Sequence, residues 1–143
     1  CNYLVTTGQS EVDPDNIGGI ARIVFECLAL KYKHILNGLI SASGKKVTQL
    51  FITGGGSKNN ILNQFTSNAL NQKVFCGPQE ATAIGNIMMQ AYGLNLYNSL
   101  DEIRTVIGNS ITISEYQPQD PELWEKASQK FLIATNIHNK SDV

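Results

Sequence analysis

The chain of 143 residues is 42% hydrophobic and 16% charged, and its formal net charge is -1. This composition suits one ordinary domain with an apolar core. It excludes the concentrated basic face that a nucleic-acid backbone needs and the long apolar run that spans a bilayer, so we expect neither partner.

A long helix that ends at Ser43 is the first predicted element. Asp13 followed by Pro14 is typical of a helix start, because Asp caps free amides and the fixed φ of proline suits the first turn. Gly44 supplies the stop. An apolar stripe with near-helical spacing marks the helix, with members Ile17, Ile20, Val24, Cys27, Leu28, Ile35 and Leu39 and a polar gap at Lys31.

A strand, a glycine turn and a second helix come next. Residues 47–53 form a short β-favouring run that is typical of a buried strand, and residues 54–56 are all glycine and turn the chain. Residues 59–70 have apolar side chains at helical spacing, and Ser57 is available as the N-cap. A second strand is expected over residues 73–76.

The remaining sequence predicts three further helices and an extended segment. Residues 79–92 favour a helix whose small-residue face we expect to meet another helix closely. Ser99 and Glu102 have the spacing of a capping box for a short helix, and residues 112–116 are extended. Asp120-Pro121 starts a last amphipathic helix.

This order of elements is a helix-rich α/β pattern with few strands and no internal domain boundary. Two strands make a poor sheet alone, so we expect further strands of the same domain upstream of Cys1. Because the chain begins with Cys1 rather than Met, we expect it to be a piece of a longer protein. Residues 136–143 are expected to fray.

Cysteines and histidines give little support for a metal site. Cys1, Cys27 and Cys76 are widely separated and odd in number, which argues against a disulfide framework and against a Cys-x-x-Cys motif. A reducing cytoplasm is the simplest location for such a chain. His34 and His138 have no ligand partner nearby in the sequence, so we expect both at the surface and predict no metal ligands.

The glycine turn is the candidate binding site. A strand that ends in Gly54, Gly55 and Gly56 and leads into a helix brings backbone amides close to an anion such as phosphate, and a Cβ would block that approach. The alternative is a tight turn that binds nothing, and the glycines alone do not decide between the two. A dinucleotide fingerprint and a P-loop are excluded, because both need glycine at Asn59 and the P-loop also needs lysine at Asn60.

Two segments resemble one known family. Residues 51–64, Phe-Ile-Thr-Gly-Gly-Gly-Ser-Lys-Asn-Asn-Ile-Leu-Asn-Gln, are similar to the adenosine-binding segment in the second domain of the carbohydrate kinases called the FGGY family. Residues 77–86, Gly-Pro-Gln-Glu-Ala-Thr-Ala-Ile-Gly-Asn, look like the segment that follows it in the rhamnulokinase branch. With the helix over residues 20–32, the resemblance covers most of residues 14–107 in order.

The resemblance implies the actin-like ATPase fold, which is ribonuclease H-like, with two domains that close around ATP and Mg. Residues 1–143 would then be part of the C-terminal nucleotide-binding domain of a two-domain sugar kinase. Gly54, Gly55 and Gly56 match the family's backbone contacts to the nucleotide, and Asn59 matches a position that approaches the adenosine. The family's catalytic aspartate and sugar-binding residues have no counterpart, so no catalytic residue is assigned.

The implied reaction is transfer of the γ-phosphoryl group of ATP to a sugar hydroxyl. Gly85-Asn86 and Gln90 point to the rhamnulokinase branch, and hence to L-rhamnulose as the sugar, which would lie mainly against the missing first domain. Glu80 invites a role as a catalytic base, but the dipole and free amides of a helix start explain a Glu there better. The isolated piece is expected to have no measurable kinase activity and at most weak ATP affinity.

Two alternatives stay open from the sequence. The chain could be a non-catalytic actin-like ATP-binding or sugar-sensing regulatory module, which a DNA-binding N-terminus on the full-length protein would support. It could also be a structural domain whose glycine turn binds nothing. The sequence does not specify an oligomeric state.

Overall fold

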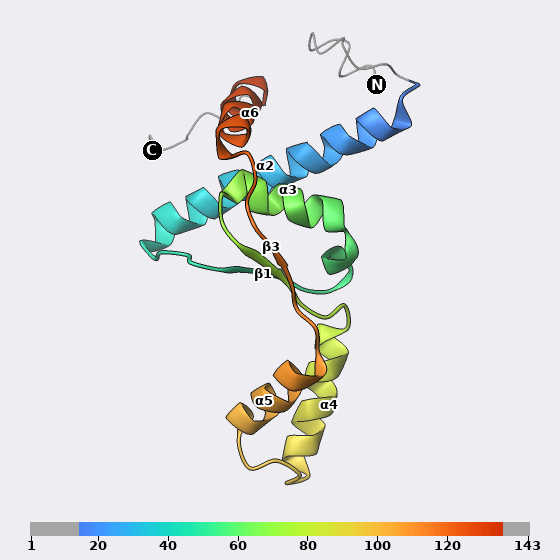
Figure 1. Cartoon of the computed structure of the whole chain (residues 1–143). Coiled ribbons are helices and arrows are strands. Elements are labelled where there is room, and N and C mark those ends of the chain that lie inside the picture. The colour runs from blue at the N-terminus through green and yellow to red at the C-terminus, as the bar shows by residue number, and fades with distance from the viewer. Residues whose placement is uncertain (1–14, 136–143) are drawn as a thin grey trace.

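Three short strands form one sheet within residues 15–135, the part of the chain that the computed structural model describes (Figure 1). The strands are β1 (Leu50–Ile52), β2 (Val74–Cys76) and β3 (Ser114–Tyr116), in the order β1-β2-β3. β1 and β2 are parallel, and β2 and β3 are antiparallel. Both predicted strands are confirmed with shorter bounds, and the predicted extended segment supplies the third strand of the helix-rich α/β pattern.

Helix α2 (Ile17–Ser43) begins after Asn16, whose side-chain oxygen accepts a hydrogen bond of 2.9 Å from the amide of Gly19. The predicted start, Asp13-Pro14, lies outside the described residues. The helix ends where the sequence predicts, because Gly44 adopts the left-handed conformation with φ 64° and its amide donates to the carbonyl of Ile40.

The face that α2 buries is not its apolar stripe. Helices α3 (Asn60–Leu70) and α6 (Pro121–Ala134) pack against α2, and the buried core consists of Ala29, Leu30, Ala69 and Trp124. Arg22, Ala29 and Lys33 share this packed face, since they are seven and four residues apart. Six stripe residues are exposed: Ile17, Val24, Cys27, Leu28, Ile35 and Leu39. The positions of α3 and α6, rather than side-chain hydrophobicity alone, therefore select the buried face.

Aromatic and charged side chains hold the three helices together. The rings of Phe65 on α3 and Trp124 on α6 lie 5.3 Å apart between centroids, and the guanidinium of Arg22 lies 5.8 Å from the centroid of Phe65. Lys33 on α2 forms an ion pair of 2.7 Å with Glu125 on α6, and the Lys33 side chain is only 17% exposed. This partial burial weakens solvent screening of the pair relative to an exposed pair.

Helix α3 covers one face of the sheet. Val74 and Cys76 are buried on that face, whereas Phe75 points to the other face and stacks on Phe51 with a centroid distance of 5.1 Å. Phe51 remains 56% exposed. No helix within residues 15–135 covers this second face, because the described helices near the sheet lie on the side of α3 (Figure 1).

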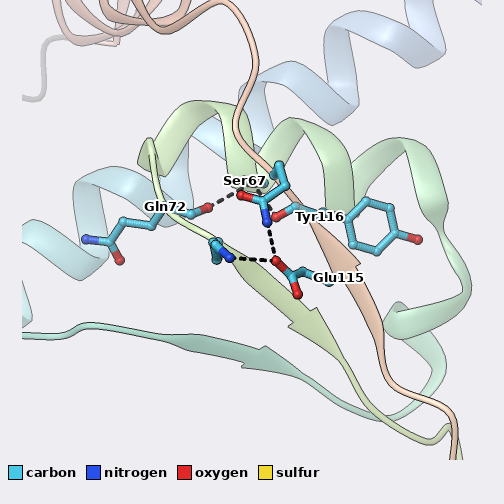
Figure 2. A network of polar contacts seen from close by, with 6 residues as sticks. Ser67, Gln72, Glu115 and Tyr116 are labelled. Carbon is cyan, nitrogen blue, oxygen red and sulfur yellow. Dashed lines mark hydrogen bonds and ion pairs between the residues drawn. The ribbon is translucent and has the colours of Figure 1, made fainter.

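A polar cluster ties α3 to the sheet, as Figure 2 shows. The hydroxyl of Ser67 on α3 lies 2.8 Å from the carbonyl oxygen of Gln72 and 3.0 Å from that of Tyr116 on β3. Lys73 and Glu115 form an ion pair of 2.9 Å beside it. Ser67 is fully buried, so its hydroxyl fixes the helix relative to the loop before β2 and to β3 without competition from water.

Helices α4 (Ala81–Gly93) and α5 (Leu100–Ser110) form a hairpin that projects from the sheet on the side away from α2, α3 and α6 (Figure 1). We call this part the α4–α5 hairpin. None of the residues of α4 is buried, whereas Ile103 of α5 is. α4 contacts α5, but no described helix approaches closely at Gly85, because a Cβ added there would meet no atom within 4 Å.

Two of the predicted helix starts differ in detail from the structure. The hydroxyl of Ser99 accepts the amide of Glu102 at 3.2 Å, as a capping box requires, but the Glu102 carboxylate accepts the amide of Asn98 rather than that of Ser99. Asp120 occupies the N-cap position of α6, as the predicted Asp-Pro start requires, but it adopts φ 48° and its side chain makes no capping hydrogen bond. Pro121 does occupy the first turn of α6.

The expected fraying of residues 136–143 falls outside the described residues. None of the helices in the described range 15–135 has the length and apolar character that a membrane crossing requires.

Candidate functional site

The glycine turn links β1 to α3 through a short 3-10 helix, Gly55–Lys58. Gly54 has φ 80° and ψ -163°, a conformation that is accessible essentially to glycine alone. Both the amide and the hydroxyl of Ser57 donate to the carbonyl of Gly54, at 3.0 Å and 2.8 Å. The turn is therefore a closed loop, held by Ser57, whose position does not depend on a ligand.

Asn59, not Ser57, is the N-cap of α3, so the prediction of a Ser57 cap is wrong. The 3-10 turn delays the start of the helix to Asn60, and the N-cap must directly precede the first helical residue. The Asn59 side-chain oxygen accepts the amide of Leu62 at 3.0 Å. Its side-chain NH2 donates no hydrogen bond to the described part of the chain, and the residue is half-buried.

Gly55 and Gly56 leave their backbone amides unused. Neither amide donates a hydrogen bond within residues 15–135, and both residues are exposed. A Cβ added at Gly55 would meet nothing within 4 Å, and one at Gly56 would lie 3.9 Å from the nearest atom, on Ile52. Neither residue has positive φ. Backbone conformation therefore requires glycine only at Gly54, and the other two glycines keep open space in front of two free donors.

The segment after β2 lies directly beside the turn. The amide of Gly77 donates to the carbonyl of Ile52 at 2.8 Å, and the amide of Gly54 donates to the carbonyl of Pro78 at 3.2 Å. A Cβ on Gly77 would lie 3.2 Å from a methyl carbon of Thr53. The fold thus joins the two segments that carry the sequence resemblance and directs the N-terminus of α4 toward the glycine turn.

Glu80 occupies the N-cap position of α4. It is exposed and makes no side-chain capping hydrogen bond. Its carboxylate therefore does not accept the free amides of the helix start, contrary to what the sequence suggested. The amides in the first turn of α4 stay available there, which adds to the donor character of this edge of the sheet.

Asn63 is a contact of the turn that the sequence reasoning missed. Its side-chain NH2 donates to the carbonyl of Ser57 at 2.9 Å, and the residue is completely buried. A signal was present in the sequence, since Asn63 is a polar residue one turn after the cap, between the apolar residues Leu62 and Phe65.

Neither described cysteine is a candidate nucleophile. Burial raises the pKa of the Cys76 thiol, and partial desolvation followed by the neighbouring Glu26 charge raises the pKa of the Cys27 thiol, although Cys27 as a residue is exposed. A raised pKa keeps each thiol protonated and unreactive near neutral pH. Nowhere in residues 15–135 do three or more His, Cys, Asp or Glu side chains gather as metal ligands.

Residues 4–94 of the chain match the C-terminal domain of the FGGY family of carbohydrate kinases. This chain belongs to the FGGY family. The matched residues include the glycine turn and all of α4. The FGGY chain is also 43% identical, over 125 residues, to rhamnulokinase of Bacteroides thetaiotaomicron, an alignment that covers 87% of this chain and 25% of that protein.

Two solved structures resemble the FGGY chain in fold. The crystal structure of Plasmodium falciparum glycerol kinase with ADP matches 85% of this chain and 24% of its own, with a TM-score of 0.68 and 20% identity. Xylulose kinase from Rhodospirillum rubrum matches 90% of this chain and 26% of its own, with a TM-score of 0.67 and 16% identity. The fold is therefore the actin-like ATPase fold of sugar kinases, and the chain spans about a quarter of the length of these relatives.

Proposed function

We propose that this FGGY chain is the part of a carbohydrate kinase that binds ATP, with the turn at Gly54, Gly55 and Gly56 as its nucleotide site and residues 1–143 as part of the C-terminal domain. The proposal rests on the backbone amides of Gly55 and Gly56, which donate no hydrogen bond within residues 15–135. The space in front of these amides is open because glycine has no Cβ. The glycerol kinase that shares the fold was solved with ADP, which supports a nucleotide as the ligand class.

The hydrogen-bond donors of the turn suit an anionic nucleotide. Two adjacent backbone N–H groups at the start of a 3-10 turn, close to the N-terminus of α4, attract phosphate oxygens through hydrogen bonds and aligned dipoles. The free side-chain NH2 of Asn59 can donate to a ring nitrogen or a ribose oxygen. When bound, ATP supplies the γ-phosphoryl group, and this chain's contribution is to hold and orient the nucleotide.

For the magnesium that the kinase family implies, the described residues contain no group of three or more His, Cys, Asp or Glu side chains that could hold it. No carboxylate cluster lies near the glycine turn, and Glu80 is a single exposed carboxylate. Mg²⁺ commonly binds through one or two carboxylates and the substrate phosphates. We therefore place the metal ligands, the sugar site and the catalytic base in the rest of the kinase.

The sugar that we propose is L-rhamnulose, within a cytoplasmic kinase. The 43% identity to a rhamnulokinase over most of the chain supports this choice. Asn86 and Gln90, the sequence features of that branch, are exposed on α4. They contact no sugar site within the described residues, so the choice depends on the similarity of sequence rather than on geometry.

A single methyl group at Gly55 tests the proposal in the full-length kinase. Gly55→Ala inserts a Cβ between the free amides and the phosphates, and we expect about tenfold weaker ATP binding because charge-assisted hydrogen bonds of about 1.5–3 kcal/mol are lengthened or lost. Isothermal titration calorimetry measures the affinity. Gly108→Ala on α5 is the matched control, since its Cβ also meets nothing within 4 Å.

The outcome separates a nucleotide site from a bare turn. If Gly55→Ala and Gly108→Ala bind ATP as the wild type does, the turn is not the site. Formation of phosphorylated L-rhamnulose by the full-length protein would distinguish the kinase from a regulatory module. The 143-residue chain alone is expected to give no measurable turnover, and robust phosphorylation by it would contradict this division of the protein.

A further inference from the structure

Asn63 combines complete burial with an incomplete set of hydrogen bonds. Its side-chain NH2 donates to the Ser57 carbonyl at 2.9 Å, but its side-chain oxygen is buried and has no hydrogen-bond partner within residues 15–135. A buried amide oxygen without a donor costs free energy, because it has lost its water and gained nothing in return. An apolar residue of similar size would avoid this cost, so packing alone does not explain an asparagine here.

The orientation of the Asn63 amide is fixed by its partner. Exchange of its oxygen and nitrogen would place two oxygens, of Asn63 and of the Ser57 carbonyl, against each other, and two acceptors cannot form a hydrogen bond. The unpartnered oxygen is therefore a consequence of the bond to Ser57. The contact that matters for the turn is the hydrogen bond that the Asn63 side-chain NH2 donates to Ser57.

The bond to Ser57 connects the rigid body of α3 with the glycine turn. Asn63 lies within the helix and its own amide donates to the carbonyl of Asn59, so its backbone is held by regular helical bonds. Ser57 in turn donates twice to the carbonyl of Gly54. A continuous chain of hydrogen bonds thus extends from α3 through Ser57 to the residue that precedes the two free amides.

We propose that Asn63 is a positioning residue for the nucleotide-binding turn: its buried side-chain amide holds the Ser57 carbonyl and thereby fixes the direction of the Gly55 and Gly56 amides. This inference rests on the proposed nucleotide site. The unpaired Asn63 oxygen lowers stability, and the bond to Ser57 that leaves it unpaired keeps the turn rigid. Rigid donors bind an anion more tightly, because less conformational entropy is lost on binding. Asn63 acts through Ser57 and does not touch the nucleotide.

Asn68 provides a matched control on the same helix. It is also buried, at 6% exposure, and its side-chain oxygen accepts hydrogen bonds from Gln64 at 2.8 Å and from the amide of Gln119 at 2.9 Å. These bonds fix the segment before α6 rather than the glycine turn. Asn63→Leu and Asn68→Leu therefore make the same chemical change in the same helix, but only the first removes a bond to the turn.

The test uses both variants in the full-length kinase. For Asn63→Leu we expect the Kd and KM for ATP to rise about five- to tenfold, the KM for the sugar to stay unchanged, and hydrogen exchange of the Ser57 and Asn59 amides to accelerate, since both close the turn. Asn68→Leu should leave all of these values as in the wild type. Asn63→Ala replaces Asn63→Leu if the leucine prevents folding.

The possible results separate this inference from the proposed function. Equal thermal destabilisation by Asn63→Leu and Asn68→Leu, with unchanged ATP affinity and unchanged exchange in the turn, would assign Asn63 an ordinary packing role and overturn the inference alone. Absence of ATP binding by the wild-type kinase would overturn the proposed nucleotide site and, with it, the positioning role. A selective loss of ATP affinity in Asn63→Leu, with faster exchange at Ser57, supports both.

Discussion

Helices α2, α3 and α6 with the sheet, which we call the packed unit, differ from the α4–α5 hairpin in how much their sequence buries (Figure 1). The packed unit contains the core of Ala29, Leu30, Ala69 and Trp124. The hairpin includes α4, which is rich in apolar residues and has none of them buried, so that Ile87 is 64% exposed. Amphipathic sequence is present in both regions, but within the described residues the buried core cluster lies in the packed unit.

The stability of the chain is therefore concentrated in the packed unit, and its proposed function lies at the boundary between the packed unit and the hairpin. The glycine turn connects β1 with α3 of the packed unit, and its neighbour Pro78 leads into α4 of the hairpin. Substitutions in the packed unit should therefore affect unfolding strongly, whereas substitutions in the hairpin should affect it little.

The largest expected effect is at Trp124. Trp124→Ala removes the ring that packs on Phe65 in the buried core and should lower the free energy of unfolding by about 3–5 kcal/mol. Urea denaturation followed by far-UV circular dichroism measures this, since Trp124 is the chain's single tryptophan and its fluorescence is lost in the variant. The adjacent Leu123→Ala, at a residue 64% exposed, should change stability by no more than about 0.5 kcal/mol.

An intermediate effect is expected at Ser67. Ser67→Ala leaves the carbonyls of Gln72 and Tyr116 without their buried donor and should cost about 1–3 kcal/mol in unfolding free energy (Figure 2). Ser110→Ala in the hairpin is the control, because that hydroxyl is exposed and bonds only to a carbonyl of its own helix. Similar denaturation midpoints for the two variants would contradict the contrast between the regions.

The smallest effect is expected at Gly85, and it has the opposite sign. Gly85→Ala should stabilise the 143-residue chain by about 0.5–1 kcal/mol, since alanine favours the helix and its methyl group meets nothing. Thermal unfolding measures the gain. Gly44→Ala should instead destabilise, because Gly44 has φ 64°. A loss of stability on Gly85→Ala in the full-length kinase would show that a partner closely approaches α4 there.

Local signals were sufficient for the elements and for the glycine turn that we propose as the nucleotide site. Glycine at position 44 ended α2 where expected, and residues 54–59 formed the turn between a strand and a helix. Residue-level detail was less predictable. Ser57 closes the turn instead of capping α3, because the intervening 3-10 helix moves the cap to Asn59. Asn63 was missed, because the sequence shows a polar residue between Leu62 and Phe65 but not that its side chain is buried against the turn.

The sequence by itself determined the family, the order of helices and strands, and the glycine content of the turn, because each depends on residues that are close together in the chain. The tertiary structure alone decided which face of α2 is buried and which amides remain free. It exposed Ile17 and Leu39 of the apolar stripe and buried Ala29, because α3 and α6 occupy the side of α2 that carries Arg22 and Lys33. Such choices depend on contacts between distant segments, and hydrophobic spacing within one helix does not contain that information.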